Sequence, residues 1–232
     1  MVIPAKNESR NLPGLLTSLS RQDYPQLART KVFVADASST DGTPEIARSF
    51  DAYLNVEVIA GGLPSVGRNA GAKLATTRYA LFIDADIELE DPTLLRRATE
   101  TMRRRNLHCL TTNIWCSNGR LSDHALYIGN NLVQYFASWT KPFATGMFML
   151  FERAKFNELG GFNEKALYAE DYLLTKQVSP RRFGIVRGSV STTNRRFQKM
   201  GHLKIVRMFL KTALNSWNES YFLRDHQYWK EA

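Results

Sequence analysis

Short apolar runs alternate with amphipathic segments along the first ninety residues, and this rhythm constrains the fold more than any other feature. Residues 31–36 and 79–83 are apolar runs of strand length, whereas leucines spaced three and four apart in residues 7–19 indicate a helix. The same criteria give strands at 2–5 and 56–60, and helices at 44–50, from Arg68 and from Pro92. Strands that alternate with helices in this order predict a mostly parallel central sheet flanked by helices, an α/β fold.

The rhythm changes after about residue 107. We expect strands at 109–115, 147–151 and 183–187, a helix at 126–139, and helix again over most of the last thirty residues. A chain of 232 residues without repeats or low-complexity linkers suits one domain with a small extension. We therefore predict one main domain over 1–200 and a carboxyl-terminal helical extension over 201–232.

Two carboxylates, Asp84 and Asp86, follow the apolar run at 79–83. Side chains at positions i and i+2 of an extended chain point the same way, so both lie at the carboxyl end of a central strand, where open α/β sheets bind ligands. A divalent cation relieves the repulsion between two such groups, and Mg²⁺ or Mn²⁺ completed by phosphate oxygens fits this pattern. The alternative is a solvated turn in which Asp86 caps the next helix.

The formal charge of +9, from 31 basic and 22 acidic residues, favours an anionic partner. A nucleoside diphosphate and a phospholipid surface both qualify. Nucleic acid is not expected, because the chain contains no recognisable base-reading module.

Cellular location is inferred from what the sequence does not contain. Neither a secretion signal nor an apolar stretch long enough to span a bilayer is present, and Cys109 and Cys116 match no zinc or redox motif. We expect two buried free thiols in a cytoplasmic protein, with peripheral attachment at the inner face of the cytoplasmic membrane as the alternative.

Five ordered segments give the chain a family resemblance. They are VIPAKNE at 2–8, Asp36 with the turn STDGT at 39–43, GRNAG at 67–71, DAD at 84–86, and GGFNE at 160–164 followed by Glu170 and Asp171. With these segments the chain resembles the inverting glycosyltransferases of family 2, which have the GT-A fold. The resemblance covers about residues 2 to 200.

The resemblance implies a donor site on the first strands. Pro4, Ala5 and Glu8 would lie against the nucleotide, and Asp36 would bond the base. Where the family often has two adjacent acids, this chain has Asp36-Ala37, so uracil and guanine both stay open. Glu8 has the alternative role of a first-turn helix carboxylate.

The resemblance also implies contacts to the metal and the diphosphate. Asp86 would bind Mn²⁺ or Mg²⁺ directly, and Asp84 would bond the ribose or the metal. Arg68, at the start of a helix, would contact a phosphate unless it is a surface charge. Arg195 and Arg196 lie where relatives place basic residues on a loop that closes on the diphosphate.

On the acceptor side, Asp171 matches the general base of the family. Its neighbour Glu170 and partial burial would raise its pKa toward a useful range. The alternative is that Asp171 caps the following helix. Gly146 is expected to allow a close backbone approach beside the sugar pocket.

These expectations describe an inverting, metal-assisted glycosyltransferase that moves a hexose from a UDP- or GDP-sugar to a hydroxyl of a sugar or lipid-linked acceptor. The Gln-x-x-Arg-Trp motif of processive synthases is absent, which favours single transfers. The alternatives are a catalytically inactive or peripheral membrane-binding domain and, less favoured, a sugar nucleotidyltransferase, which would need a glycine-rich first loop. The membrane alternative rests on the amphipathic final helix, in which Leu203, Leu210 and Trp217 share one face. Packing of that face on the catalytic core is the other possibility.

Overall fold

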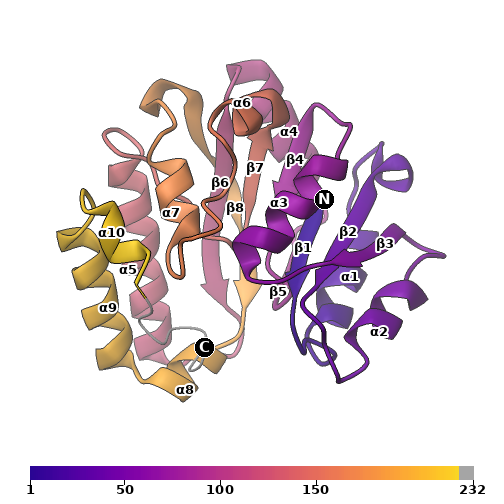
Figure 1. Cartoon of the computed structure of the whole chain (residues 1–232), viewed down its shortest axis with the longest axis horizontal. Coiled ribbons are helices and arrows are strands. Elements are labelled where there is room, and N and C mark those ends of the chain that lie inside the picture. The colour runs from indigo at the N-terminus through magenta and orange to yellow at the C-terminus, as the bar shows by residue number, and fades with distance from the viewer. Residues whose placement is uncertain (225–232) are drawn as a thin grey trace.

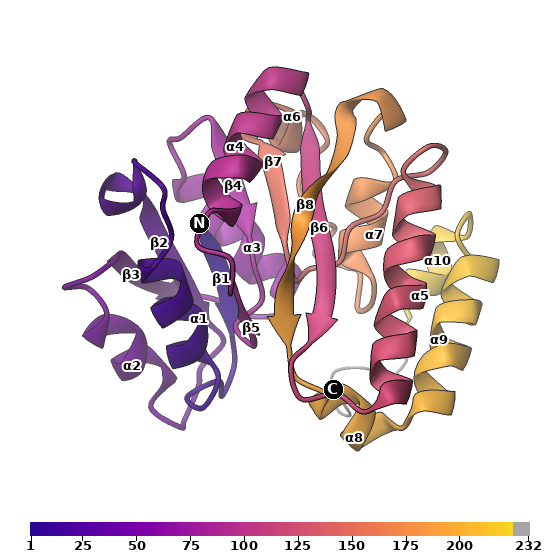
Figure 2. The same ribbon diagram turned by 180° about the vertical axis from the view of Figure 1, so that it is seen from behind.

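The computed structural model describes residues 1–224 and shows one sheet with helices on both faces (Figures 1 and 2). The strands are β1 Val2–Ala5, β2 Lys31–Asp36, β3 Asn55–Ala60, β4 Tyr79–Phe82, β5 Ile87–Glu88, β6 Cys109–Cys116, β7 Met149–Glu152 and β8 Phe183–Thr192. The helices are α1 Leu12–Ser20, α2 Thr43–Ser49, α3 Pro64–Leu74, α4 Leu94–Arg105, α5 Leu121–Ala137, α6 Arg153–Glu158, α7 Glu170–Thr175, α8 Arg195–Met200, α9 His202–Leu214 and α10 Glu219–Phe222.

The strand order is β3-β2-β1-β4-β7-β6-β8-β5. Strands β1, β2, β3 and β4 pair in parallel, as do β6 and β8, whereas β7 and β5 run antiparallel to their neighbours. The sheet is therefore mixed, with its parallel half formed by the segment in which strands and helices alternate. The antiparallel strand β7 lies between the parallel strands β4 and β6, although the helix α5 precedes it in the sequence.

Helices α3 and α7 cover one face of the sheet, and α1 and α4 cover the other (Figures 1 and 2). All four leucines of the predicted stripe in α1 are buried, in a core cluster that also includes Ile3, Val34 and Ile83. Cys109 and Cys116 are free and buried, as predicted.

The start of α3 corrects one expectation. The helix begins at Pro64 rather than near Arg68, so Gly67 and Gly71 lie inside it. A Cβ atom on Gly71 would stand 2.4 Å from a methyl carbon of Val2, and one on Gly67 would stand 3.0 Å from the Ala35 Cβ. These glycines allow α3 to pack closely on β1 and β2 and are not loop residues.

The carboxyl-terminal extension packs against the rest of the chain through both α9 and α10. The ring of Phe222 in α10 is fully buried with Tyr168 and Leu173, and its carbonyl accepts a hydrogen bond of 3.0 Å from the Leu167 amide. Most of the apolar face predicted for α9 is exposed, with Leu203, Leu210 and Trp217 at 63%, 58% and 74%. Residues 225–232 of the predicted extension lie outside the described residues.

Among the described helices, none combines the length and the apolar character that crossing a membrane requires.

Candidate active site

The predicted site residues gather at the carboxyl ends of β1, β2 and β4. The position follows from topology, because parallel strands end at the same edge of a sheet and the loops after them meet there. Side chains from α3, α7 and α8 converge on this edge from elsewhere in the sequence.

Arg68 lies between two carboxylates at the centre of the site. Its Nη2 is 2.6 Å from Oδ1 of Asp84, its Nη1 is 2.6 Å from Oε1 of Glu170, and only 3% of its side chain is exposed. The guanidinium carbon also lies 5.4 Å from the centre of the Phe162 ring. A buried cation needs such partners to offset its lost hydration, so Arg68 joins Asp84 to Glu170 across the site.

This arrangement explains Gly146, which lies on the loop before β7. A Cβ atom at this position would stand 2.3 Å from Nη2 of Arg68 and 3.3 Å from Oδ1 of Asp84. Any side chain would displace the ion pair, so the close backbone approach expected at this glycine is present.

Asp171 is the second residue of α7 and is partly buried. Its Oδ2 accepts a hydrogen bond of 2.7 Å from the Gly146 amide, and its Oδ1 accepts one of 2.7 Å from the Tyr172 amide. Burial, and secondly the negative charge of Glu170, raises the pKa of Asp171 to about 7, although Arg68 and the two amides act in the opposite direction. A carboxyl group that changes charge near neutral pH suits proton transfer.

Arg195, at the start of α8, holds a second pair of acids. Its Nη1 and Nη2 contact the two carboxylate oxygens of Glu8 at 3.2 and 3.0 Å, and Nη2 also lies 3.0 Å from Oδ2 of Asp86. Burial, and secondly the charge of Asp84, raises the pKa of Asp86, while the charges of Arg195 and Arg196 lower it. Glu8, Asp86 and Arg195 thus form a charged cluster beside the end of β4.

Asp36 ends β2 beside Ala5 of β1, with which it is in register. Its Oδ2 accepts a hydrogen bond of 3.0 Å from the Ser39 amide, whereas its Oδ1 is buried and has no partner within the described part of the chain. A buried acceptor without a donor is costly, so this oxygen is positioned to accept a bond from a ligand N–H.

The carboxylate oxygens of the site can be compared with the ligands that a divalent cation requires. Asp84 and Asp86 each engage one carboxylate oxygen with an arginine, and among residues 1–224 no hydrogen bond uses the other oxygen. Those two oxygens fit Mg²⁺ or Mn²⁺, which takes one or two carboxylates and completes its shell with phosphate and water. No cluster of three or more His, Cys, Asp or Glu side chains suited to a metal occurs within the described residues.

Two contributors were not predicted. The Asn69 side chain donates to the Phe162 carbonyl at 2.8 Å and to Glu164 at 2.9 Å, and it accepts from the Phe162 amide at 2.9 Å. It therefore fixes the GGFNE segment to α3, while Phe162 supports the Arg68 guanidinium. Both residues belong to segments that resemble the family, but nothing in their spacing shows that they meet.

The structure brings most of the predicted residues together. Asp84, Arg68, Glu170, Asp171 and Gly146 form one contiguous group, and Glu8, Asp86 and Arg195 form an adjacent one. The phosphate contact predicted for Arg68 rested on a helix start that the structure does not have. Both of its terminal nitrogens face carboxylates, so a phosphate would have to replace one of them.

Comparison with known protein families gives one matching model. The model described as glycosyl transferase family 2 matches residues 1–160, more than half of the chain. Among curated relatives, the poly(ribitol-phosphate) β-N-acetylglucosaminyltransferase TarS of Staphylococcus aureus is 28% identical over 187 residues, which are 75% of this chain and 31% of TarS. The 4,4'-diaponeurosporenoate glycosyltransferase of Staphylococcus haemolyticus is 34% identical over 110 residues, 45% of this chain and 28% of that protein. The chain thus spans about a third of the length of these relatives.

Solved structures share the fold. S. aureus TarS 1–349 in complex with UDP-GlcNAc superimposes with a TM-score of 0.67 at 23% identity, covering 83% of this chain and 57% of that one. The mannosyltransferase PcManGT from Pyrobaculum calidifontis, in complex with GDP-Man and Mn²⁺, gives a TM-score of 0.67 at 20% identity, covering 90% and 63%. The predicted GT-A architecture is confirmed at the level of the fold.

Proposed function

The chain belongs to glycosyl transferase family 2, and from that membership we propose that it transfers a hexose from a UDP-sugar to an acceptor hydroxyl with inversion at the sugar carbon. The observation that best supports this proposal is the group formed by Asp84, Arg68, Glu170 and Asp171. In this group Asp171, whose pKa is raised, lies beside Glu170, which contacts the Arg68 guanidinium. Arg68 in turn contacts Asp84 beside the proposed donor site.

Asp171 is the proposed general base. Inversion by single displacement requires a group on the acceptor side that removes the proton from the attacking hydroxyl as the sugar bond forms. The amides of Gly146 and Tyr172 orient the Asp171 carboxylate, and Arg68 neutralises Glu170 so that two adjacent acids can share the pocket.

Asp86 and Asp84 would hold Mn²⁺ or Mg²⁺, which supplies Lewis-acid stabilisation of the leaving diphosphate. Arg195 lies beside these acids with its guanidinium shared between Glu8 and Asp86. It is positioned to bond a diphosphate oxygen when the donor is bound, and Arg196 adds positive charge next to it.

Asp36 favours uracil over guanine. The Watson–Crick edge of guanine offers two neighbouring N–H donors, whereas uracil offers a single one at N3. Oδ2 of Asp36 accepts from the Ser39 amide, and within residues 1–224 its Oδ1 has no partner, so one ligand donor suffices. The likeness to TarS, whose structure contains UDP-GlcNAc, supports the same choice.

The test is the release of nucleoside diphosphate from UDP-GlcNAc and GDP-mannose in Mn²⁺ or in EDTA. We expect release from the UDP-sugar only with metal, its abolition by Asp86→Ala, and a fall of about 10²–10⁴-fold in turnover with Asp171→Asn, the usual contribution of a general base. Asp171→Asn should still bind UDP, and Asp23→Asn, the same change on the surface, should have no effect. Full turnover in Asp171→Asn would contradict the proposed base.

We also propose that the protein docks on an anionic lipid surface through α5 and α9. The two helices lie side by side in both views (Figures 1 and 2) and are joined near each end. His202 contacts Asp123 at one end, and Lys141 lies over the Trp217 ring at the other. Their outer surface, the α5/α9 face, exposes Leu121, Ile128, Leu132, Val133, Tyr135, Phe136, Trp139, Leu203, Phe209, Leu210, Leu214 and Trp217.

The basic residues near the α5/α9 face favour an anionic partner. Exposed large apolar side chains gathered on two neighbouring helices are typical of an interaction site. Lys204, Arg207 and Lys211 are exposed on α9, which contains no acidic residue, and Lys141 lies over the Trp217 ring. Large apolar side chains beside lysine and arginine suit the boundary between acyl chains and anionic headgroups.

Co-sedimentation with phosphatidylcholine vesicles, with and without phosphatidylglycerol, tests this surface. We expect binding that needs the anionic lipid, is weakened by Trp139→Ser with Trp217→Ser, and is unchanged by Tyr53→Ser with Leu74→Ser, two exposed apolar residues elsewhere. A dimer in light scattering that the tryptophan variant dissociates would show that a second copy covers the face instead, and would contradict the lipid proposal.

A further inference from the structure

The loop between α5 and β7 is bonded to α7 on the acceptor side of the site. The Ala144 amide donates to the Thr175 hydroxyl at 3.2 Å, and the Gly146 amide donates to Oδ2 of Asp171 at 2.7 Å. Residues 142–145 belong to no helix or strand, so their position depends on contacts of this kind.

The two bonds match in spacing. Asp171 and Thr175 are four positions apart on α7, so they lie on the same face, about 6 Å apart along the helix axis. Ala144 and Gly146 are two positions apart, a separation that spans at most about 7 Å of chain. The loop can therefore make both bonds at once, running from the last turn of α7 towards its first.

Thr175 is fully buried, and its hydroxyl has two partners. It donates to the Asp171 carbonyl at 2.8 Å while it accepts from the Ala144 amide. A hydroxyl can do both because it has one donor and two acceptor lone pairs. An aliphatic side chain of the same size would leave the buried Ala144 amide without this acceptor.

The loop also touches the other half of the site, because Gly146 lies directly against the Arg68–Asp84 ion pair. The charged groups with the largest effect on Asp171 are Glu170 of its own helix and Arg68 of α3. A change at Thr175 removes neither group. Its effect on Asp171 would therefore pass through the loop and the Gly146 amide.

We propose that Thr175 is a positioning residue for Asp171, holding the loop so that the Gly146 amide stays on the Asp171 carboxylate. Its importance for transfer rests on the proposed role of Asp171 as the base. An amide that donates to a carboxylate stabilises the ionised form and fixes the direction of that oxygen. Without Thr175 the base would ionise at higher pH and would be less well aligned with the acceptor hydroxyl.

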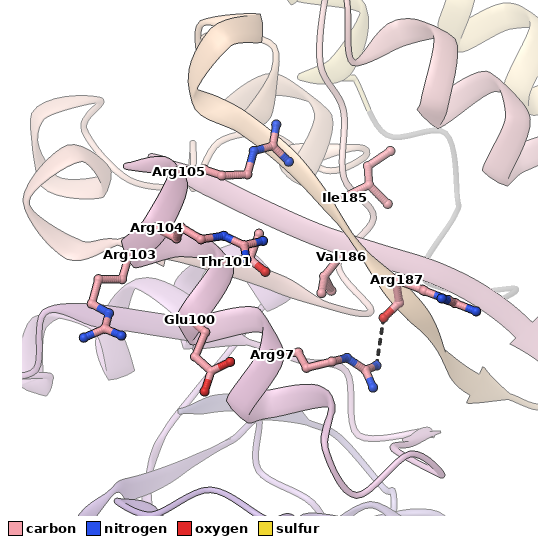
Figure 3. Close-up of a pocket in the computed structure, with 9 residues that line it drawn as sticks. All are labelled: Arg97, Glu100, Thr101, Arg103, Arg104, Arg105, Ile185, Val186 and Arg187. Carbon is pink, nitrogen blue, oxygen red and sulfur yellow. Dashed lines mark hydrogen bonds between the residues drawn. The ribbon is translucent and has the colours of Figure 1, made fainter.

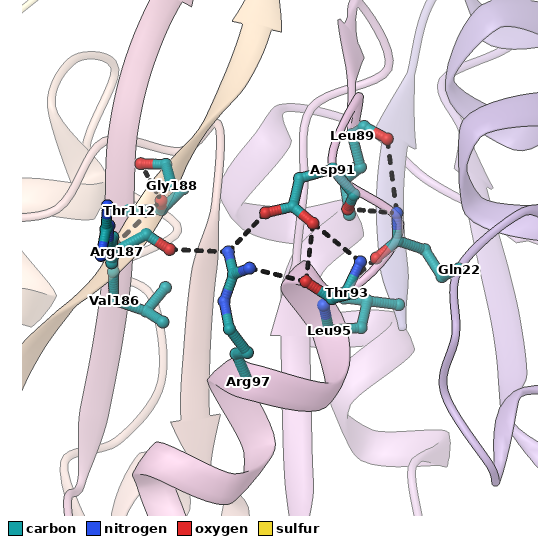
Figure 4. Close-up of polar contacts among 10 residues, drawn as sticks. All are labelled: Gln22, Leu89, Asp91, Thr93, Leu95, Arg97, Thr112, Val186, Arg187 and Gly188. Atoms are coloured by element: carbon teal, nitrogen blue, oxygen red, sulfur yellow. Dashed lines mark hydrogen bonds and ion pairs between the residues drawn. The ribbon is translucent and has the colours of Figure 1, made fainter.

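Three variants separate this role from a general effect on packing. Thr175→Val removes the hydroxyl and keeps the volume, whereas Thr175→Ser keeps the hydroxyl. Thr112→Val is the matched control, because the Thr112 hydroxyl is also buried and lies 3.3 and 2.9 Å from the carbonyls of Val186 and Gly188 (Figure 4). Val186 lines a pocket of about 700 Å³ beside α4 (Figure 3), and α4 covers the face of the sheet opposite α7.

Carbon-13 NMR of the side-chain carboxyl groups, in EDTA, measures the ionisation of Asp171 directly, with Asp171→Asn assigning the signal. We expect the pKa of Asp171, about 7 in the wild type, to rise by about one pH unit in Thr175→Val. This is the size expected when an ionised group loses a hydrogen bond. Thr175→Ser should restore the wild-type value, and Thr112→Val should leave it unchanged.

The proposal would be overturned by an unchanged titration of Asp171 in Thr175→Val, by an equal rise in Thr112→Val, or by failure of Thr175→Ser to restore the wild-type value. Each of these results is independent of sugar transfer.

Transfer kinetics then distinguish this proposal from the proposed function. In Thr175→Val, kcat should fall about tenfold, the pH midpoint of kcat/KM should follow the NMR titration, and UDP affinity should stay within about twofold. A loss of UDP affinity without a change in the pH profile would show a merely structural role and contradict the proposal. Wild-type transfer that does not follow the titration of Asp171 would instead contradict the assignment of the base, while the NMR result would still decide the link between Thr175 and Asp171.

Discussion

At the scale of single residues, the site depends on how buried charges are paired. Arg68 lies between Asp84 and Glu170, and neither the helix that bears it nor its sequence neighbours indicated this role. Its partners lie 16 and 102 positions away along the chain, so no local pattern shows the contact. The sequence predicted which residues matter at this site but not which of them touch.

Replacing Arg68 by methionine should be severely destabilising. It leaves the buried Glu170 carboxylate without its cation, and breaking a buried pair in this way costs about 3–5 kcal/mol. Arg68→Lys should lose less stability but still impair transfer, because lysine cannot contact both acids in the same fork geometry. Urea unfolding measures the free energy, and a loss below about 1 kcal/mol in Arg68→Met, as for an exposed pair, would show that the pair is not buried in solution.

The raised pKa of Asp171 predicts the pH profile of transfer. The base must be ionised, so kcat/KM should rise with pH through about 7 and then level off. Glu170→Gln removes the neighbouring negative charge and should move this midpoint to lower pH. A profile that is flat between pH 5 and 8 would exclude Asp171 as the titrating group.

The raised pKa of Asp171 also makes the stability of the folded state depend on pH. The contribution of this residue to stability falls over the pH range in which transfer is expected to rise. The folded state holds a proton on Asp171 up to about pH 7, whereas the unfolded chain releases it near pH 4, so this residue makes folding less favourable as pH rises between those values. The melting temperature of Asp171→Asn relative to wild type should therefore increase from pH 5 to pH 8. Asp23→Asn should show no such trend.

At the scale of elements, apolar runs predicted the strands well because burial on both faces leaves a clear pattern. Two of the errors occurred at glycines. Gly67 looked like a loop residue but lies inside α3, where its missing side chain admits Ala35. Strand β8 was expected to end at Arg187 but continues through Gly188, at φ +121°, to Thr192. A glycine required by packing and a glycine that ends an element look the same in one sequence.

Asp123 should be the main link between α5 and the carboxyl-terminal helices. It accepts from the Arg120 amide at the start of α5 and contacts His202 and Asn194 at 2.5 and 3.1 Å. Asp123→Ala removes a cap and leaves buried donors unpaired, so we expect a loss of about 2–4 kcal/mol in the free energy of unfolding. Ser122→Ala, whose hydroxyl also contacts His202, is the control and should cost less than about 1 kcal/mol.

At the scale of the whole molecule, the boundary at residue 200 remains a prediction, and the contacts across it suggest a test. Phe222 fills the space beside Tyr168 and Leu173, next to the helix that bears Asp171. Removing residues 201–232 should therefore lower both the melting temperature and transfer, and Phe222→Ala in the full chain should cost about 3–5 kcal/mol. Full activity of residues 1–200 alone would instead establish a separable catalytic unit.

The burial of Phe222 against Tyr168 and Leu173 has a consequence for biosynthesis. A chain leaves the ribosome from its amino terminus, and early segments can fold while later ones are still being made. The sheet and the donor edge can form in that interval, but α7 lacks one of its supports until α10 has emerged. We therefore expect the nascent protein to bind nucleotide before it transfers sugar efficiently, and full activity to be reached when α10 docks.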